Sequence, residues 1–250
     1  MAMRLAFDMD GVLADLHTVY TQAALKLYPE LDRAAIATAD VGASPPEADD
    51  ASADPDVPDP AASFAVSRRQ SEAIWKHLGG INNFWETLSE IEPGAIARLA
   101  ALAEERRWEI LFITSRPKSI GSTIQRQSQR WLQAKGFPMP SLFVVHGSRG
   151  RIAQALNLDV VVDDRPDNCL DVALESSAGA ILLWRGSAAS VPASAKRLGI
   201  AVSPTVQACL ETLIEAEEQS EAEGSFLDRL RRVFGLRTRP ASTILRRGAQ

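Results

Sequence analysis

Residues 4–15 read RLAFDMDGVLAD. A short apolar run is followed by two aspartates and a glycine. The opening run, 4–7, is typical of a strand covered on both faces. Asp8 and Asp10 follow directly, and both carboxylates can project toward one site because successive strand residues point to opposite faces. Gly11 permits a tight departure from the strand. The stretch therefore predicts a buried strand with a chemical site at its carboxyl end.

Further apolar runs rich in β-branched residues recur along the chain and are separated by helical patterns. The additional expected strands are 109–113, 142–145, 160–162 and 180–184, and the clearest helices between them are 96–107 and 120–135. Strands that alternate with helices pair in parallel. We expect an α/β fold, a Rossmann-like doubly wound and mostly parallel sheet, whose ligands bind at the carboxyl ends of its strands.

The stretch 16–90 breaks this alternation. It begins as a helix, becomes rich in Asp, Pro, Ala and Ser over about 40–63, and regains apolar and aromatic residues afterwards. The middle part cannot bury enough apolar area to offset chain entropy, so a flexible and solvated insertion is the simplest interpretation. We expect a small helical cap at 16–90, inserted after the first strand of a core formed by 1–15 and 91–202.

The remaining residues, 203–250, are expected to form C-terminal helices and a basic amphipathic tail. Ser203 and Pro204 are typical of a helix start. The segment 225–236 carries apolar residues on one face and arginines off it. Such a segment could contact an anionic membrane or a protein partner weakly, or dock on its own domain.

Composition excludes several classes of protein. The chain of 250 residues has a net charge of −5, which argues against binding to a nucleic acid polymer. No apolar stretch approaches the roughly 20 residues needed to cross a bilayer, and no signal peptide is recognised. We expect a cytoplasmic globular protein that acts on a small molecule.

Two later strands also end in polar residues suited to chemistry. Thr114 and Ser115 offer hydroxyls next to a helix start, which suits a phosphate, although either could be a plain helix cap. Asp163 and Asp164 are paired acids, which alone could be a turn with a surface ion pair. Carboxylates gathered at one sheet edge repel each other unless a cation relieves them, and Mg²⁺ takes such oxygen ligands.

The order of these motifs resembles the haloacid dehalogenase (HAD) superfamily of aspartate-nucleophile phosphotransferases. Residues 8–11 match its first motif, 114–115 its second and 163–164 its fourth. The family usually has a lysine shortly before the fourth motif, and this chain has none there. Arg149 is the expected substitute and Arg151 the second choice, because arginine keeps the charge and can bind phosphate bidentately.

The resemblance implies a mechanism. Asp8 would attack phosphorus and form an aspartyl-phosphate, and Asp10 would donate a proton to the leaving oxygen and later take one from water. Mg²⁺ would be held by Asp8, the backbone carbonyl of Asp10 and the pair Asp163 and Asp164. Thr114, Ser115 and Arg149 (or Arg151) would bind the phosphoryl oxygens.

Within the superfamily the chain is similar to the 5'(3')-deoxyribonucleotidases at 8–15, 84–88, 93–95 and 163–166. This implies a nucleoside monophosphate as substrate, with Trp75, Phe84 and Trp85 stacking on the base, or else simply forming the core of the cap. Two alternatives stay open. The chain could hydrolyse another small phosphorylated metabolite, or, lacking the lysine, it could be a catalytically impaired binding or scaffold protein.

Overall fold

Six short apolar strands form a single sheet in the order β3-β2-β1-β4-β5-β6, and every neighbouring pair is parallel. The strands are β1 (Arg4–Asp8), β2 (Glu109–Thr114), β3 (Ser141–Val144), β4 (Val160–Asp163), β5 (Gly179–Leu183) and β6 (Ala201–Ser203). The expected α/β class and parallel sheet are confirmed. The sequence missed β6, because three residues are too few to show a pattern.

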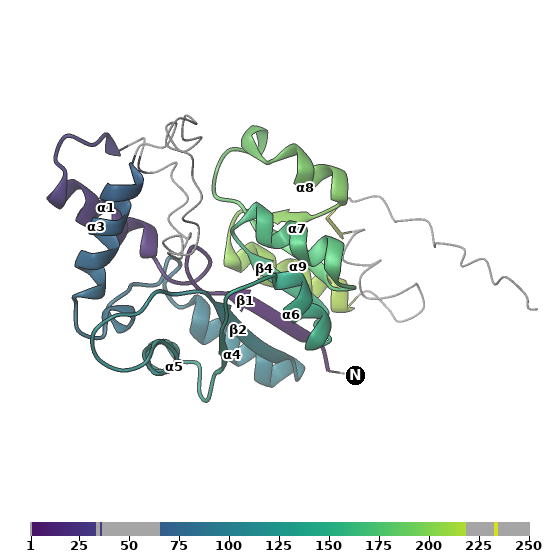
Figure 1. The fold of residues 1–250 in the computed structure, drawn as a ribbon. Helices are drawn as coiled ribbons and strands as arrows, with labels where there is room; N and C mark the ends of the chain where they lie inside the picture. The colour runs from purple at the N-terminus through teal and green to yellow at the C-terminus, as the bar shows by residue number, and fades with distance from the viewer. Residues whose placement is uncertain (1, 34–35, 37–65, 219–232, 235–250) are drawn as a thin grey trace, which may run out of the picture.

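The computed structural model describes residues 2–33, 36, 66–218 and 233–234 (Figure 1). The acidic insertion expected at about 40–63 lies outside these residues. The amphipathic segment 225–236 also lies outside them, apart from residues 233 and 234.

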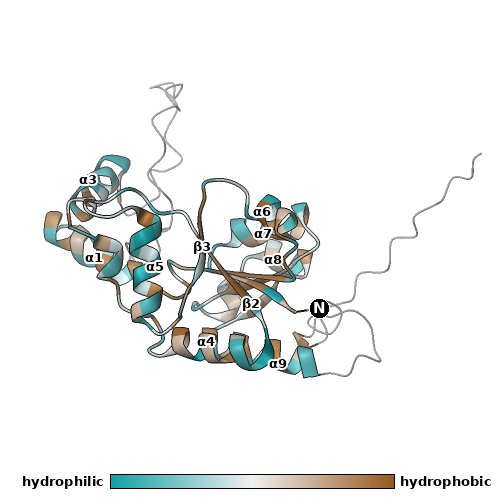
Figure 2. Ribbon diagram, turned by 90° about the horizontal axis from the view of Figure 1, so that it is seen from below, coloured by the Kyte–Doolittle hydropathy of each residue, from teal (hydrophilic) through white to brown (hydrophobic). Residues whose placement is uncertain are grey.

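Helices cover both faces of the sheet (Figure 2). They are α1 (Leu16–Leu27), α3 (Arg68–Gly79), α4 (Ala95–Arg106), α5 (Ile124–Ala134), α6 (Arg149–Ala155), α7 (Pro166–Glu175), α8 (Ala193–Leu198) and α9 (Val206–Glu218), with single 3₁₀ turns η2 (Phe84–Glu86) and η3 (Ala188–Ser190). α4, α5 and α9 share one apolar cluster, and α6, α7 and α8 share the other. None of the described helices is long and apolar enough to cross a membrane.

The strand order places β1 at the centre of the sheet. Phe7 of β1 lies beside Phe112 of β2 and Val162 of β4. The order reverses at β1, and in open parallel sheets a ligand crevice forms outside the carboxyl ends of the strands at such a switch point. The polar residues that follow β1, β2 and β4 are therefore adjacent.

Helix α5 begins at Ile124, four residues later than the sequence pattern predicts. Thr123 caps it by accepting a hydrogen bond from the backbone N–H of Arg126 at 3.4 Å. Gly121, at a φ of 109°, interrupts helical geometry just before the cap. Helix α9 likewise begins at Val206, because Ser203 belongs to β6.

Helices α1 and α3 pack side by side beyond the carboxyl edge of the sheet (Figure 1). Asp15 caps α1, and Ser67 with Gln70 forms a capping box at the start of α3. Trp75 of α3 belongs to the same apolar cluster as Phe112 of the sheet. The core therefore continues without a break from the sheet into this helix pair.

Candidate active site

The loop after β1 is tightly folded and presents two carboxylates. The backbone N–H groups of Leu13 and Ala14 both donate to the carbonyl oxygen of Met9, at 2.8 and 2.7 Å. Gly11 has a φ of 85°, and a side chain there would overlap the carboxylate of Asp164. Glycine is therefore required both for the turn and for the close approach of β4.

Asp8, the last residue of β1, is buried and paired with a buried arginine. Nη2 of Arg149 donates to Oδ1 of Asp8 at 3.0 Å, and Nε of the same arginine lies 3.7 Å from Oδ2 of Asp163. Arg149 is the first residue of α6, whose cap is Ser148. The helix start thus delivers one guanidinium between the ends of β1 and β4, where a cation relieves two acids at once.

Asp10 is held by a different arginine, which the sequence analysis did not single out. Nε and Nη2 of Arg116 donate to the two oxygens of Asp10 at 2.7 and 2.6 Å. Thr114 adds a hydrogen bond from Oγ1 to Oδ2 of Asp10 at 3.2 Å. These three donors occupy three of about four acceptor positions of a carboxylate, and the one left is on Oδ1.

The paired acids after β4 differ in their surroundings. Asp163 is fully buried and accepts hydrogen bonds from the backbone N–H of Arg165 at 2.9 Å and from Nδ2 of Asn168 at 3.0 and 2.9 Å. Oδ1 of Asp164, by contrast, is buried and has no hydrogen-bond partner among the described residues. A buried oxygen without a donor is costly unless a ligand or cation satisfies it.

Burial raises the pKa of three of these carboxyl groups. The pKa of Asp8 is raised by desolvation and by the charge of Asp163, against the opposing effect of Arg149. Desolvation also raises the pKa of Asp163. It raises the pKa of Asp164 to about 8, with Asp163 adding to the effect. Two buried acids and a half-buried one that resist ionisation together are typical of a site prepared for a cation or for catalysis.

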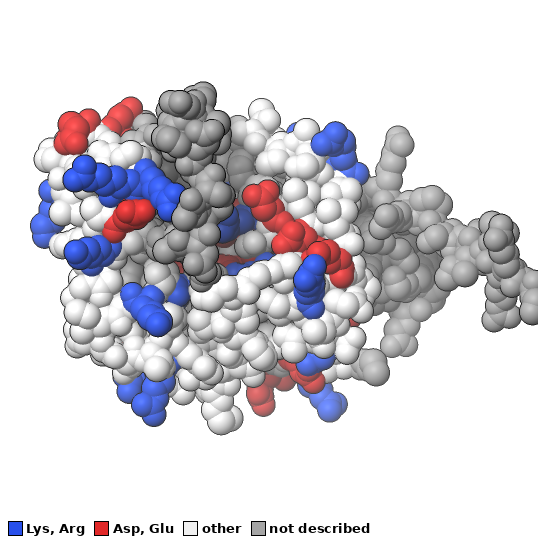
Figure 3. Space-filling model, viewed as in Figure 1, with Lys and Arg blue, Asp and Glu red and all other residues white. Residues whose placement is uncertain are grey.

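The donor set and the buried orphan oxygen fit a hard divalent cation such as Mg²⁺. Within the described residues, however, no three His, Cys, Asp or Glu side chains are placed so that they already form a metal-binding group. The reason is visible in the pairing, since Asp8 and Asp10 each point to an arginine. Figure 3 shows acidic and basic side chains close together in the middle of this face of the molecule.

Neither a known family model nor a curated protein sequence matches the chain. Solved structures do match. A hydrolase from Pseudomonas syringae aligns with a TM-score of 0.51 at 16% identity, over 87% of this chain and 100% of that one. A HAD family hydrolase from Deinococcus radiodurans R1, solved with bound phosphate and sodium, aligns with a TM-score of 0.51 at 17% identity, over 85% of this chain and 95% of that one.

This chain has the fold of a HAD family hydrolase. In this HAD fold the residues predicted from the first, second and fourth motifs lie at the ends of three adjacent strands, β1, β2 and β4. Of the two arginines considered as substitutes for the motif lysine, Arg149 reaches Asp8. Arg151 does not, because it is 82% exposed on the outside of α6 and faces Glu175 at 3.7 Å.

The three aromatics considered either for base stacking or for the core of the cap are buried. Phe84 and Trp85 are each 1% exposed and pack edge to face at 4.8 Å, and Trp75 lies 6.3 Å from Trp85. Their faces are occupied by one another and by Arg116, which lies 4.6 Å over the Trp85 ring. This packing favours the other interpretation, in which the three aromatics form the core of the cap.

Two residues near the site, Arg116 and His146, were given no functional role from the sequence. Arg116 immediately follows Thr114 and Ser115 in the sequence, and this position next to the second motif could have indicated that it lies in the site. His146 comes after β3, and its Nδ1 lies 3.0 Å from Oγ of Ser115. Only the pairing of β3 with β2 brings that histidine to the second motif.

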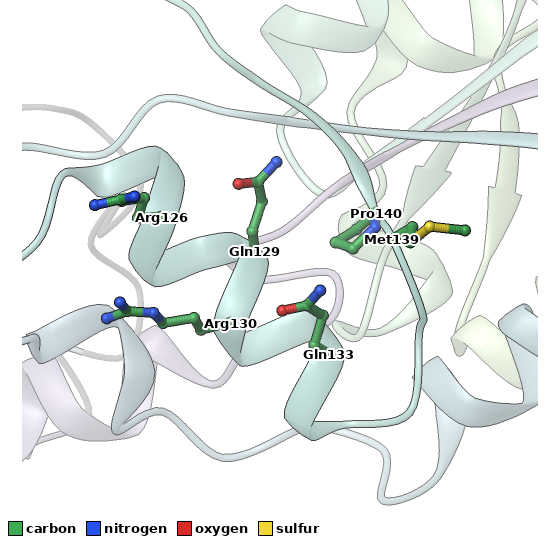
Figure 4. Close-up of a pocket in the computed structure, with 6 residues that line it drawn as sticks. All are labelled: Arg126, Gln129, Arg130, Gln133, Met139 and Pro140. Carbon is green, nitrogen blue, oxygen red and sulfur yellow. The ribbon is translucent and has the colours of Figure 1, made fainter.

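A hollow lies along α5 (Figure 4). It has a volume of about 420 Å³ and is lined by Arg126, Gln129, Arg130, Gln133, Met139 and Pro140. Its lining includes none of the acids after β1 and β4. The catalytic candidates therefore remain those at the carboxyl edge of the sheet.

Proposed function

We propose that the chain is a HAD-type phosphatase that hydrolyses phosphate monoesters with Asp8 as its nucleophile. The observation that carries the proposal is the pairing of buried Asp8, at the end of the central strand, with buried Arg149. A guanidinium beside the attacking carboxylate is well placed to receive phosphoryl oxygens. The bound phosphate of the HAD family hydrolase from Deinococcus radiodurans R1 is consistent with this chemistry.

The first half-reaction transfers the phosphoryl group to the protein. An oxygen of Asp8 bonds to phosphorus while the bond from phosphorus to the leaving oxygen breaks. Asp10 donates its proton to that leaving oxygen, so an alcohol departs. The acceptor position left on Oδ1 of Asp10 is where this proton would be carried, since Arg116 and Thr114 occupy the others.

The second half-reaction restores the carboxylate. Water attacks the phosphorus of the aspartyl-phosphate, Asp10 takes a proton from it, and the bond between Asp8 and phosphorus breaks to release inorganic phosphate. Arg149, with the hydroxyl of Ser115, would bind the equatorial oxygens as charge develops on them. Thr114 would contribute mainly by orienting Asp10.

Mg²⁺ is the proposed cofactor, held by Asp8, Asp164, the backbone carbonyl of Asp10 and, less directly, Asp163. The support is the buried unpartnered oxygen of Asp164 and the excess of acids over buried arginines on this side of the site. A bound Mg²⁺ would neutralise phosphate charge and favour the ionised form of Asp8.

The finer substrate class is also a proposal. A nucleoside 5'-monophosphate follows from the sequence likeness to the deoxyribonucleotidases. The burial of Trp75, Phe84 and Trp85 favours the second candidate, a small phosphorylated metabolite without a base, because these rings cannot stack on a ligand as they are packed.

Phosphate release from a panel of nucleoside monophosphates and sugar phosphates, with Mg²⁺ or with a chelator, tests the function. We expect Mg²⁺-dependent turnover that Asp8→Asn abolishes while the fold is retained. Asp15→Asn is the matched control, because asparagine caps α1 as well as aspartate does and turnover should persist. Absence of turnover by the wild-type protein across the panel would instead favour an impaired binding protein.

A further inference from the structure

Arg116 is one of the largest fully buried side chains of the protein, at 1% exposure. Nε and Nη2 grip the two oxygens of Asp10, and Nη1 donates to Oγ of Ser128 in α5 at 2.7 Å. A buried guanidinium is tolerated when two of its nitrogens donate to a carboxylate and the third also has a hydrogen-bond acceptor. A two-point contact of this kind fixes the plane of the Asp10 carboxylate, not only its place.

Trp85 supports the guanidinium from one side. The central carbon of Arg116 lies 4.6 Å from the centroid of the indole ring, within the range of a cation–π contact. The indole is itself fixed, because Nε1 donates to the carbonyl oxygen of Pro117 at 3.1 Å and the backbone N–H donates to Oε1 of Gln127 at 3.1 Å. The ring of Trp75 in α3 also packs against it, with the ring centroids 6.3 Å apart.

We propose that Arg116 is a positioning residue for Asp10 and that Trp85 acts through Arg116, so that the aromatic core joining α3 and η2 to the sheet sets the orientation of the second carboxylate. The inference rests on the proposed function and deepens it. Proton transfer to the leaving oxygen requires Asp10 to be aligned with it. A guanidinium held only by Asp10 could swing with it, whereas one seated on Trp85 and Ser128 cannot.

Arg116→Lys is the direct test. Lysine keeps the charge but cannot make the planar two-point contact or lie flat on the indole. We expect kcat to fall by about ten- to a hundred-fold, a fraction of what general acid–base catalysis supplies, while KM changes little. A change confined to KM would place Arg116 in substrate binding and overturn the positioning role.

Trp85→Leu tests the support, with Trp108→Leu as its matched control. Trp108 is buried in the same apolar cluster, donates from Nε1 to Glu217 at 2.9 Å and precedes β2 at the opposite edge of the sheet. Both variants should lower the melting temperature to a similar extent. Only Trp85→Leu should lower kcat, by about ten-fold. Equal kcat in the two variants would show that Trp85 is merely structural.

The double variant of Arg116→Lys and Trp85→Leu decides whether Trp85 acts through Arg116. Its kcat should be close to that of Arg116→Lys alone, because the ring then has no guanidinium to seat. If the double variant lost kcat by the product of the two single-variant factors, the coupling would be refuted. Trp85→Phe, which retains an aromatic face, serves if the leucine variant does not fold, and should lie between wild type and Arg116→Lys. If the wild-type protein shows no turnover, the proposed function itself is wrong. If the wild type is active and the variants have the same kcat, only the positioning role is wrong.

Discussion

Asp8 and Asp10, at the carboxyl end of β1, stand two residues apart. Each meets a buried arginine, and yet their surroundings differ. Asp10 has one arginine to itself, bound through two nitrogens. Asp8 shares Arg149 with Asp163 and has a single hydrogen bond from it. On the Asp10 side the charge of the carboxylate is balanced by Arg116 alone, and the two hydrogen bonds fix the orientation of the carboxylate. On the Asp8 side one buried guanidinium, that of Arg149, meets both Asp8 and Asp163, and the charge of Asp164 acts on Asp8 as well.

This difference explains which side needs a further cation. If all three acids on the Asp8 side ionise, one arginine leaves an excess of two negative charges, which a divalent ion would balance. The Asp10 side has no such excess. We therefore propose that the Asp8 side binds metal and phosphate, and that the Asp10 side is a prearranged proton donor and acceptor.

The largest effect should come from removing the shared arginine. Arg149→Met leaves Asp8 and Asp163 buried without a cation, so we expect a loss of about 3–5 kcal/mol in the free energy of unfolding and no measurable turnover. Arg151→Met, two residues along the same helix and exposed, should change the unfolding free energy by less than about 0.5 kcal/mol. Chemical denaturation of both variants measures this. Similar losses in both would mean that Arg149 does not balance the acids.

The next effect concerns pH. The pKa of Asp164 is about 8 in the folded chain, against 3.8 for an ordinary aspartate, so the folded state binds this proton more tightly than the unfolded state. The contribution of Asp164 to stability is therefore fully present below about pH 4 and is lost as pH rises toward about 8. Melting curves in chelator should show a shallower decline for Asp164→Asn than for wild type.

Some decline should persist in that variant, because the pKa values of Asp8 and Asp163 are also raised. Added Mg²⁺ should restore the wild-type melting temperature at pH 8 more than at pH 5, where the carboxyl group is protonated. Identical pH slopes for wild type and Asp164→Asn would contradict the assignment of Asp164.

A smaller effect is expected at Gly11, where backbone strain can be distinguished from steric overlap with Asp164. Gly11 and Gly94 have nearly the same φ, 85° and 84°. A Cβ on Gly11 would overlap Asp164, whereas a Cβ on Gly94 would meet no described atom within 4 Å. Gly94→Ala should cost about 1–2 kcal/mol, the strain of alanine in a left-handed conformation. Gly11→Ala should cost more in denaturation experiments and should weaken Mg²⁺ binding measured by calorimetry. If both variants lost the same unfolding free energy and Mg²⁺ binding were unchanged, the Asp164 side chain would have moved aside without cost.

The smallest effect lies on the Asp10 side. Ser128→Ala removes the hydroxyl that satisfies Nη1 of Arg116 in the interior, and we expect a loss of about 1–2 kcal/mol. Ser122→Ala removes a hydroxyl that accepts from exposed Arg130 at 3.0 Å, and water can replace it. That control should change stability by less than about 0.5 kcal/mol by thermal unfolding. A reversed order would show that Arg116 is not held from α5.

The fold was largely predictable because its signals are local. Continuous apolar runs mark strands covered on both faces, and the intervening helices require parallel pairing. The strand β6 and the true start of α5 were missed. A three-residue strand has no periodicity, and the start of α5 is decided by the cap at Thr123 and the φ of Gly121.

The sequence by itself determined which residues end the strands, and so which acids and hydroxyls meet at one edge of the sheet. Only the tertiary structure decided how they pair. Arg149 and not Arg151 reaches Asp8, because Arg149 lies on the buried side of the first turn of α6 and Arg151 on its exposed side. Trp85 supports Arg116 instead of a ligand, because the packing of η2 against α5 covers its ring. Partner choice depends on distances between segments far apart in the chain, and no local pattern carries that information.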